Sequence, residues 1–126
     1  MSPQLSQLME HVLKSPWYVD KSQVPGYWVG GKTGTAQVWD AEHQRWFFNI
    51  YNFSCVGFIG REKGHPDLII AVRIGEAPPN RGATGQFFLP VTSTELFRRV
   101  ATDAISTPGL LPMTTAGETS AAPVAR

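Results

Sequence analysis

The fold of this 126-residue chain is decided by one stretch, Tyr27-Trp28-Val29-Gly30-Gly31-Lys32-Thr33-Gly34-Thr35-Ala36-Gln37-Val38-Trp39. Aromatic and β-branched residues open and close the stretch, which is typical of a β-strand. Three glycines interrupt it, and glycine inside a strand often marks a place where another group approaches the backbone closely. We therefore predict a strand over Tyr27–Trp39 with a close neighbour along part of its length.

Two apolar runs downstream predict two further strands. The runs are Phe53–Ile59 and Leu68–Ile74, and the polar segment Gly60–Asp67 joins them in the manner of a hairpin. Because apolar residues fill both runs almost continuously, we expect both faces of these strands to be covered, most simply by helices. Asp40–Arg45 predicts a polar turn, and Trp46-Phe47-Phe48 predicts an extension of a flanking strand beyond the sheet.

A helix is expected before these strands. Ser2 as the cap, a proline at the first helical position and an apolar stripe at helical spacing predict this helix over Pro3–Lys14. Ser15-Pro16 ends it, because proline disfavours a helical conformation in the preceding residue. The polar connection Val19–Pro25 is expected to be irregular.

A second helix is expected after the strands, with a well-marked start. Thr92-x-x-Glu95 fits a capping box, and the apolar spacing that follows predicts a helix ending near Ser106. Before it, Gly75–Gly85 is rich in glycine and proline and predicts a loop. Residues 107–126 consist mainly of Pro, Ala, Thr and Ser, and they predict a disordered tail.

The order of these elements predicts the fold class. One helix, three strands and a second helix indicate an α/β fold of the α+β type, in which helices flank an antiparallel sheet. The length of 126 residues suits a single globular unit. We therefore expect one domain over residues 1–106 and a tail over residues 107–126.

Composition excludes several classes of partner and site. Eleven Lys and Arg against ten Asp and Glu leave a formal charge of +1, without the basic excess of a nucleic-acid-binding surface. The single Cys55 excludes an intrachain disulfide and a multi-cysteine zinc site, and we expect it to be a buried hydrophobe. The three histidines lack metal-ligand spacing, so neither a metal nor another cofactor is expected. No stretch approaches the roughly 18 apolar residues of a membrane-spanning helix.

The candidate functional site is Lys32-Thr33-Gly34-Thr35. A ligand that ends in a carboxylate needs a fixed positive charge and neutral hydrogen-bond donors, and the lysine and two threonines supply both. Alternate residues of a strand share a face, so Thr33 and Thr35 point together, while Gly34 removes a side chain between them. An exposed strand edge of this kind can also receive an extended peptide. The alternative interpretation is an exposed strand with ordinary surface Lys and Thr.

The motifs resemble the C-terminal part of the penicillin-binding transpeptidase domain, in the serine acyl-transferase family that includes the serine β-lactamases. Lys-Thr-Gly is one of the three motifs of that family, beside Ser-x-x-Lys and Ser-Asp-Asn. The similarity continues through Val24–Gln37, Ser54–Phe58, Leu68–Ile74 and Gly85–Phe97, and it is strongest to the monofunctional, class B type. It implies a β-lactamase/transpeptidase-like fold and an extracytoplasmic protein of peptidoglycan synthesis, anchored through a region outside this chain.

The resemblance also implies a role for each residue of the candidate site. Lys32 would assist proton transfer and anchor the substrate. The Thr33 and Thr35 hydroxyls would hold the carboxylate of a D-alanyl-D-alanine stem peptide, or of a β-lactam that mimics it. The backbone N–H of Thr35 would be an oxyanion-hole donor, and Gly34 would let the acyl group approach. Lys32 and Thr35 are thus the expected catalytic residues, and Thr33, Gly34 and Thr35 the expected substrate-binding residues.

The nucleophile of that family is missing from these residues. No serine in the chain has a lysine three positions later, and none begins Ser-x-Asn. The chain therefore carries one wall of an active site, is expected to be inactive alone, and would have the missing N-terminal part of the same protein as a partner. Two alternatives stay open: a segment of a serine β-lactamase, and a non-catalytic penicillin-binding-like interaction module. The reading frame upstream of Met1 would separate these alternatives.

Overall fold

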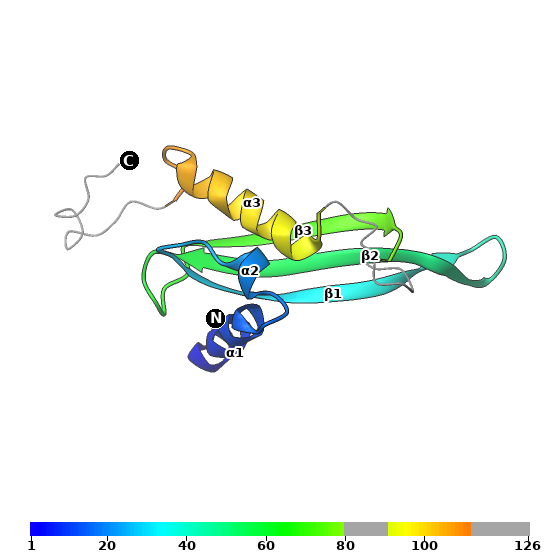
Figure 1. Cartoon of the computed structure of the whole chain (residues 1–126), viewed down its shortest axis with the longest axis horizontal. Coiled ribbons are helices and arrows are strands. Elements are labelled where there is room, and N and C mark those ends of the chain that lie inside the picture. The colour runs from blue at the N-terminus through cyan, green and yellow to red at the C-terminus, as the bar shows by residue number, and fades with distance from the viewer. Residues whose placement is uncertain (80–90, 112–126) are drawn as a thin grey trace.

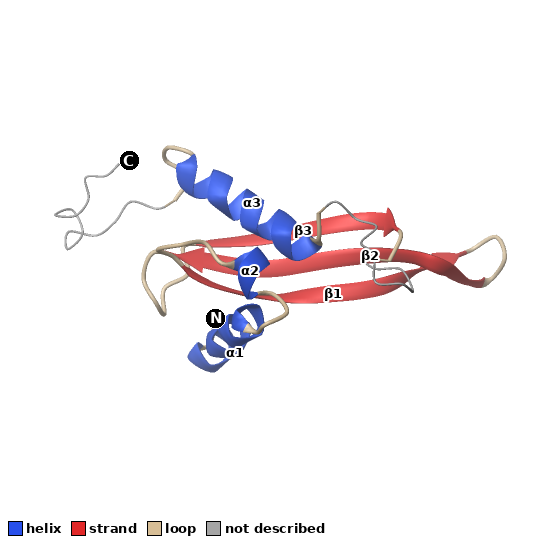
Figure 2. Cartoon of the chain, in the orientation of Figure 1, coloured by secondary structure: helices blue, strands red, loops and turns tan. Residues whose placement is uncertain are grey.

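A computed structural model describes residues 1–79 and 91–111 of the chain (Figure 1). Within these residues three helices and three strands follow one another in the order helix, helix, strand, strand, strand, helix. Their bounds are α1 Pro3–Lys14, α2 Val19–Ser22, β1 Trp28–Asp40, β2 Arg45–Gly60, β3 Leu68–Ala77 and α3 Ser93–Ser106. The predicted class, an antiparallel sheet flanked by helices, is confirmed (Figure 2).

The sheet is antiparallel, with its strands in the order β1-β2-β3. Thr35 of β1 is paired with Phe53 of β2, and Cys55 of β2 is paired with Val72 of β3. Each of the three predicted strands is present, and the predicted turn over Asp40–Arg45 joins β1 to β2. In the described part of the chain β1 therefore forms one edge of the sheet, which leaves one side of its backbone without a partner strand.

Two strands are longer than the sequence predicts. β2 begins at Arg45, which confirms the predicted strand extension at Trp46-Phe47-Phe48 and adds residues 49–52 to the strand. Trp39 packs against Trp46 across the hairpin with ring centroids 5.1 Å apart. β3 continues to Ala77 and so occupies the start of the predicted loop Gly75–Gly85, whose residues 80–85 lie outside the described residues. Cross-strand contacts outweigh the turn propensity of this segment, because the Asn52 side chain of β2 accepts a hydrogen bond from the Glu76 backbone N–H at 3.0 Å.

The two long helices begin and end as predicted. The Ser2 hydroxyl accepts a hydrogen bond from the Leu5 backbone N–H at 3.1 Å and caps α1. The Thr92 hydroxyl accepts one from the Glu95 N–H at 3.2 Å and caps α3. The prediction for Val19–Pro25 was wrong in part, because Val19–Ser22 forms the short helix α2.

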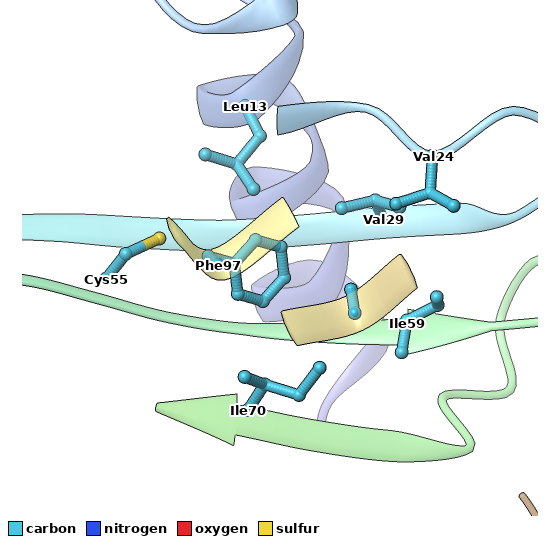
Figure 3. Close-up of a cluster of buried hydrophobic side chains, with 8 residues drawn as sticks. Leu13, Val24, Val29, Cys55, Ile59, Ile70 and Phe97 are labelled. Atoms are coloured by element: carbon cyan, nitrogen blue, oxygen red, sulfur yellow. The ribbon is translucent and has the colours of Figure 1, made fainter. Parts of the chain in front are cut away.

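One hydrophobic core lies between the sheet and the helices. The buried side chains come from α1, α3, the sheet and the α2–β1 connection, and Figure 3 shows their arrangement: Leu13, Val24, Val29, Cys55, Ile59, Ile70, Phe97 and Ala101. The Cys55 side chain is fully buried, which confirms its predicted role. Burial raises the pKa of the Cys55 thiol to about 11.

The two faces of the sheet are covered to different extents. The pocket face, which carries Cys55 and Ile70, packs against α3 through the fully buried Phe97. The open face carries the neighbouring residues of the same strands, because side chains alternate along a strand. On it Val56 and Ile69 are 44% and 62% exposed. The expectation that both faces are covered was therefore wrong for the described residues. The open face is buried only in part, at Phe58 beside α1.

Candidate functional site

The segment Lys32–Thr35 lies on the edge strand β1, and its two threonines line one pocket. The pocket has a volume of about 390 Å³ and lies on the pocket face of the sheet. Its walls come from β1, from the segment around α2, from β2 and from the start of α3. The lining residues are Trp17, Tyr18, Lys21, Thr33, Gly34, Thr35, Phe53, Thr92, Ser93 and Thr94.

Thr33 and Thr35 share this pocket because they are two residues apart on a strand. The Tyr18 hydroxyl lies 3.2 Å from the Thr33 hydroxyl, within hydrogen-bond distance. Pro16 ends α1, and the chain then turns, with the Tyr18 N–H donating to the Ser15 carbonyl oxygen at 3.0 Å. This turn carries the tyrosine ring to the sheet, so Tyr18 can fix the orientation of the Thr33 hydroxyl.

Lys32 points away from these threonines. Its side chain belongs to the open face by strand alternation and is not among the residues that line the pocket. Its ammonium group donates a hydrogen bond to the Thr33 carbonyl oxygen at 2.6 Å. Among the described residues the cationic side chain that lines the pocket is that of Lys21, in α2.

Close neighbours leave little room for a side chain at two glycines of β1. A Cβ atom at position 34 would lie 2.7 Å from the Ser54 hydroxyl oxygen of β2. A Cβ atom at position 30 would lie 2.4 Å from the Phe58 ring and 2.8 Å from the Glu10 backbone nitrogen. Gly30 therefore lets α1 approach the sheet, as the predicted close neighbour of the strand. At Gly34 the tight contact is to a side chain of the adjacent strand.

Trp28 has a structural role beside α1. It is buried, its ring packs on Phe58 with centroids 4.4 Å apart, and its Nε1 donates to the Glu10 carboxylate at 2.7 Å. The same carboxylate accepts a hydrogen bond from Lys14 at 2.6 Å. These two hydrogen bonds, the one from Lys14 being the stronger influence, lower the pKa of Glu10 below its ordinary value of 4.5.

Several pocket residues were not identified from the sequence. Tyr18, Phe53 and Thr94 are the main ones, and each comes from a different element. The capping signal at Thr92 locates the start of α3 correctly, but nothing in it says which strand that start will face. Only the packing of α3 on the pocket face brings its first turn opposite the β1 threonines.

A family model described as the penicillin binding protein transpeptidase domain matches residues 1–92. A search of curated proteins gave no match. Among solved structures, the chain is similar to the apo transpeptidase domain of penicillin-binding protein 3 from Burkholderia pseudomallei, with 25% identity and a TM-score of 0.63. That match covers 90% of this chain and 31% of the other.

Two structures of penicillin-binding protein 3 from Mycobacterium tuberculosis share the fold. The complex with ampicillin has 22% identity and a TM-score of 0.63, and the complex with aztreonam has 22% identity and a TM-score of 0.61. Each match covers 90% of this chain and 27% of the other. The chain thus spans less than a third of the length of the solved structures named here.

Proposed function

Because the chain belongs to the penicillin-binding protein transpeptidase family, we propose that it is the C-terminal segment of a peptidoglycan D,D-transpeptidase domain. In this proposal its β1 strand binds the carboxylate of the stem peptide or of a β-lactam. The observation that carries the proposal is the shared pocket of Thr33 and Thr35, open at an edge strand. Two hydroxyl donors on one wall are suited to a carboxylate, which accepts several hydrogen bonds at once.

Each residue of Lys32–Thr35 has a separate role in this proposal. The Thr33 and Thr35 hydroxyls donate to the carboxylate, and the Tyr18 hydroxyl, 3.2 Å from Thr33, keeps the first of them in position. The backbone N–H of Thr35 is an oxyanion-hole donor, and Gly34 keeps the approach to it clear of a side chain. Lys32, on the other face of the strand, contacts the acyl-transfer groups that the rest of the domain supplies.

The nucleophile lies outside this chain in this proposal. None of its serines has a lysine three positions later, so the Ser-x-x-Lys pair would come from the preceding part of the protein. The domain would act outside the cytoplasmic membrane, where peptidoglycan is cross-linked. No helix in residues 1–79 and 91–111 is long and apolar enough to cross a membrane.

The proposal is tested by acylation of the longer protein that continues this reading frame upstream. Thr35→Val removes one carboxylate donor, and we expect acylation by a fluorescent penicillin to slow by about tenfold to a hundredfold, since hydrogen bonds to charged groups contribute about 1.5–3 kcal/mol. Lys32→Met should slow it at least as much. Thr102→Val is the matched control, because Thr102 lies on α3 and its hydroxyl donates to the Arg98 carbonyl oxygen away from the pocket. Unchanged rates in both site variants would contradict the assignment of these residues.

A non-catalytic interaction module is the second candidate. Both candidates agree with the absence of Ser-x-x-Lys from these residues, and they differ in what precedes them. It predicts that the reading frame upstream of Met1 contains neither Ser-x-x-Lys nor Ser-x-Asn, whereas the transpeptidase proposal requires both.

A further inference from the structure

The pocket has a second polar wall, opposite the threonines of β1, at the first turn of α3. Thr94 lies on this turn and lines the pocket, although its exposed fraction is only 3%. Its hydroxyl has no hydrogen-bond partner among the residues that the structure describes, whereas the neighbouring Ser93 hydroxyl donates to the Ser54 carbonyl oxygen at 3.2 Å. The Thr94 hydroxyl is not among the polar atoms that are fully buried without a partner, so it reaches the pocket, where it can donate a hydrogen bond to a polar ligand atom.

Two backbone N–H groups of the same turn are also without acceptors in the helix. The Leu96 N–H makes the first intrahelical hydrogen bond, to the Thr92 carbonyl oxygen at 2.9 Å, and the Thr92 hydroxyl caps the Glu95 N–H. The N–H groups of Ser93 and Thr94 come before these bonds. They lie at the positive end of the dipole of a 14-residue helix, which favours an anion.

The charges around this wall are compatible with an anion. Glu95 is the acidic residue of the first turn, and its carboxylate is paired with Arg99 at 2.9 Å and lies 3.9 Å from Arg98. The guanidinium groups therefore offset its negative charge. Lys21 adds a positive charge to the lining of the pocket.

The remaining walls show what kind of anion fits. Tyr18 and Phe53 contribute aromatic rings beside the two polar walls, together with the exposed Trp17. Rings of this kind contact an apolar body, whereas an inorganic anion would leave them unused. The lining therefore suits an organic carboxylate with a small apolar group attached.

We propose that the first turn of α3 is part of the carboxylate site: the Thr94 hydroxyl and the N–H groups of Ser93 and Thr94 bind the carboxylate that Thr33 and Thr35 hold from the other side. The inference rests on the proposed function and adds a third element of the fold to the binding site. It makes Thr94 a substrate-binding residue, contributed by the helix that closes the sheet.

The test is a titration of the 126-residue chain with N-acetyl-D-alanyl-D-alanine, followed by the NMR signals of the backbone amides. We expect the acid to shift the amides of Thr35 and Thr94, and the C-terminal amide of the same dipeptide to leave both unmoved. Thr94→Val keeps the shape of the side chain but removes the hydroxyl, so the dissociation constant of the acid should rise about tenfold. Thr94→Ser restores a hydroxyl and should bind within about twofold of the original chain.

Controls separate this inference from the proposed function. Thr102→Val makes the same chemical change on an outward part of α3 and should leave binding unchanged. If Thr35→Val weakens binding and Thr94→Val does not, the role of α3 is overturned while the proposed function stands. If Thr94→Ser loses as much affinity as Thr94→Val, the effect is one of packing, and the inference is again overturned. If the acid shifts neither Thr35 nor Thr94, both the inference and the proposed carboxylate site are overturned.

Discussion

The pocket face and the open face of the sheet are built from the same strands, yet the helices of the described residues cover the pocket face and leave much of the open face exposed. On the pocket face Cys55 is fully buried beneath the helices, and on the open face its neighbour Val56 is 44% exposed. The strands carry apolar residues toward both faces, although the open face also carries Ser54 and Arg73, and the helices cover the two faces unequally. α3 packs on the pocket face, and α1 lies beside β1 near the start of that strand (Figure 1).

The difference assigns separate physical roles to the two faces. Burial of apolar area against α3 stabilises the fold, and the same packing brings the first turn of α3 to the pocket. Exposed apolar area at Val56 and Ile69 adds little to stability and favours association. Stability and ligand binding should therefore depend on the pocket face, and solubility on the open face.

The largest expected effect is the loss of the main contact between α3 and the sheet. Phe97→Ala removes a fully buried ring, and it should lower the free energy of unfolding by about 3–5 kcal/mol. Val100→Ala, on the same helix at 38% exposure, should cost less than about 1 kcal/mol. Urea unfolding followed by circular dichroism measures both, and similar losses in the two variants would contradict the packing of α3 described above.

Iodoacetamide labelling of a cysteine at position 55 or at position 56 measures how well each face of the sheet is covered. Burial raises the pKa of Cys55 from 9.0 to about 11, so its thiolate fraction at pH 8 falls about a hundredfold. Because the thiolate is the reactive form, iodoacetamide should label Cys55 at least a hundredfold more slowly in the folded chain than in urea. Val56→Cys in a Cys55→Ala background places the thiol one residue along on the open face, where folding should slow labelling only slightly. Equal protection at both positions would show that the open face is covered.

Local signals in the sequence predict the elements of this fold well. The cap at Ser2 and the proline after it fix α1, and the cap at Thr92 fixes α3, because capping depends on residues within one turn. Residue spacing also predicts that Thr33 and Thr35 share a face. α2 was missed because four residues are too few to show helical periodicity.

The rest depends on contacts between distant parts of the chain. Tyr18 lies fifteen positions before Thr33, its hydrogen-bond neighbour, and Thr94 follows Thr35 by more than fifty. No local pattern links such residues, so the second wall of the pocket could not be predicted. A continuous apolar run such as Leu68–Ile74 also fails to distinguish a face covered by this chain from an exposed one.

A smaller effect is expected at Glu10, where α1 meets Trp28. Hydrogen bonds from Lys14 and Trp28 lower the pKa of Glu10 in the folded chain. The ionised carboxylate therefore adds to the free energy of unfolding at pH values above its ordinary pKa of 4.5. This contribution is lost as the pH falls through the lowered pKa of the folded chain. Glu10→Gln should cost about 1 kcal/mol at pH 7.

The pH dependence distinguishes this charge effect from a packing effect. Below pH 4.5 the difference between Glu10→Gln and the original chain should shrink, since the original carboxylate is then being protonated as well. Unfolding curves at pH 7, 5 and 3 measure it. Asp67 and Asp40, whose pKa values hydrogen bonds from Arg61 and His43 lower, stay in both chains and contribute to the pH dependence that remains. A constant difference at all three pH values would assign the effect to side-chain packing.

The smallest expected effect on stability lies on the open face. Ile69→Thr replaces a side chain that is 62% exposed and keeps its β-branched shape in β3, so the free energy of unfolding should change by less than about 0.5 kcal/mol. Self-association should nevertheless fall, because the change removes apolar area from the exposed patch. Analytical ultracentrifugation over a range of concentrations measures this self-association.

Ile70→Thr is the matched control one residue away: Ile70 is buried on the pocket face, and its replacement should destabilise the fold instead. If Ile69→Thr destabilised the chain as strongly as Ile70→Thr, the two faces would be equally buried in solution, and the contrast between them would not hold.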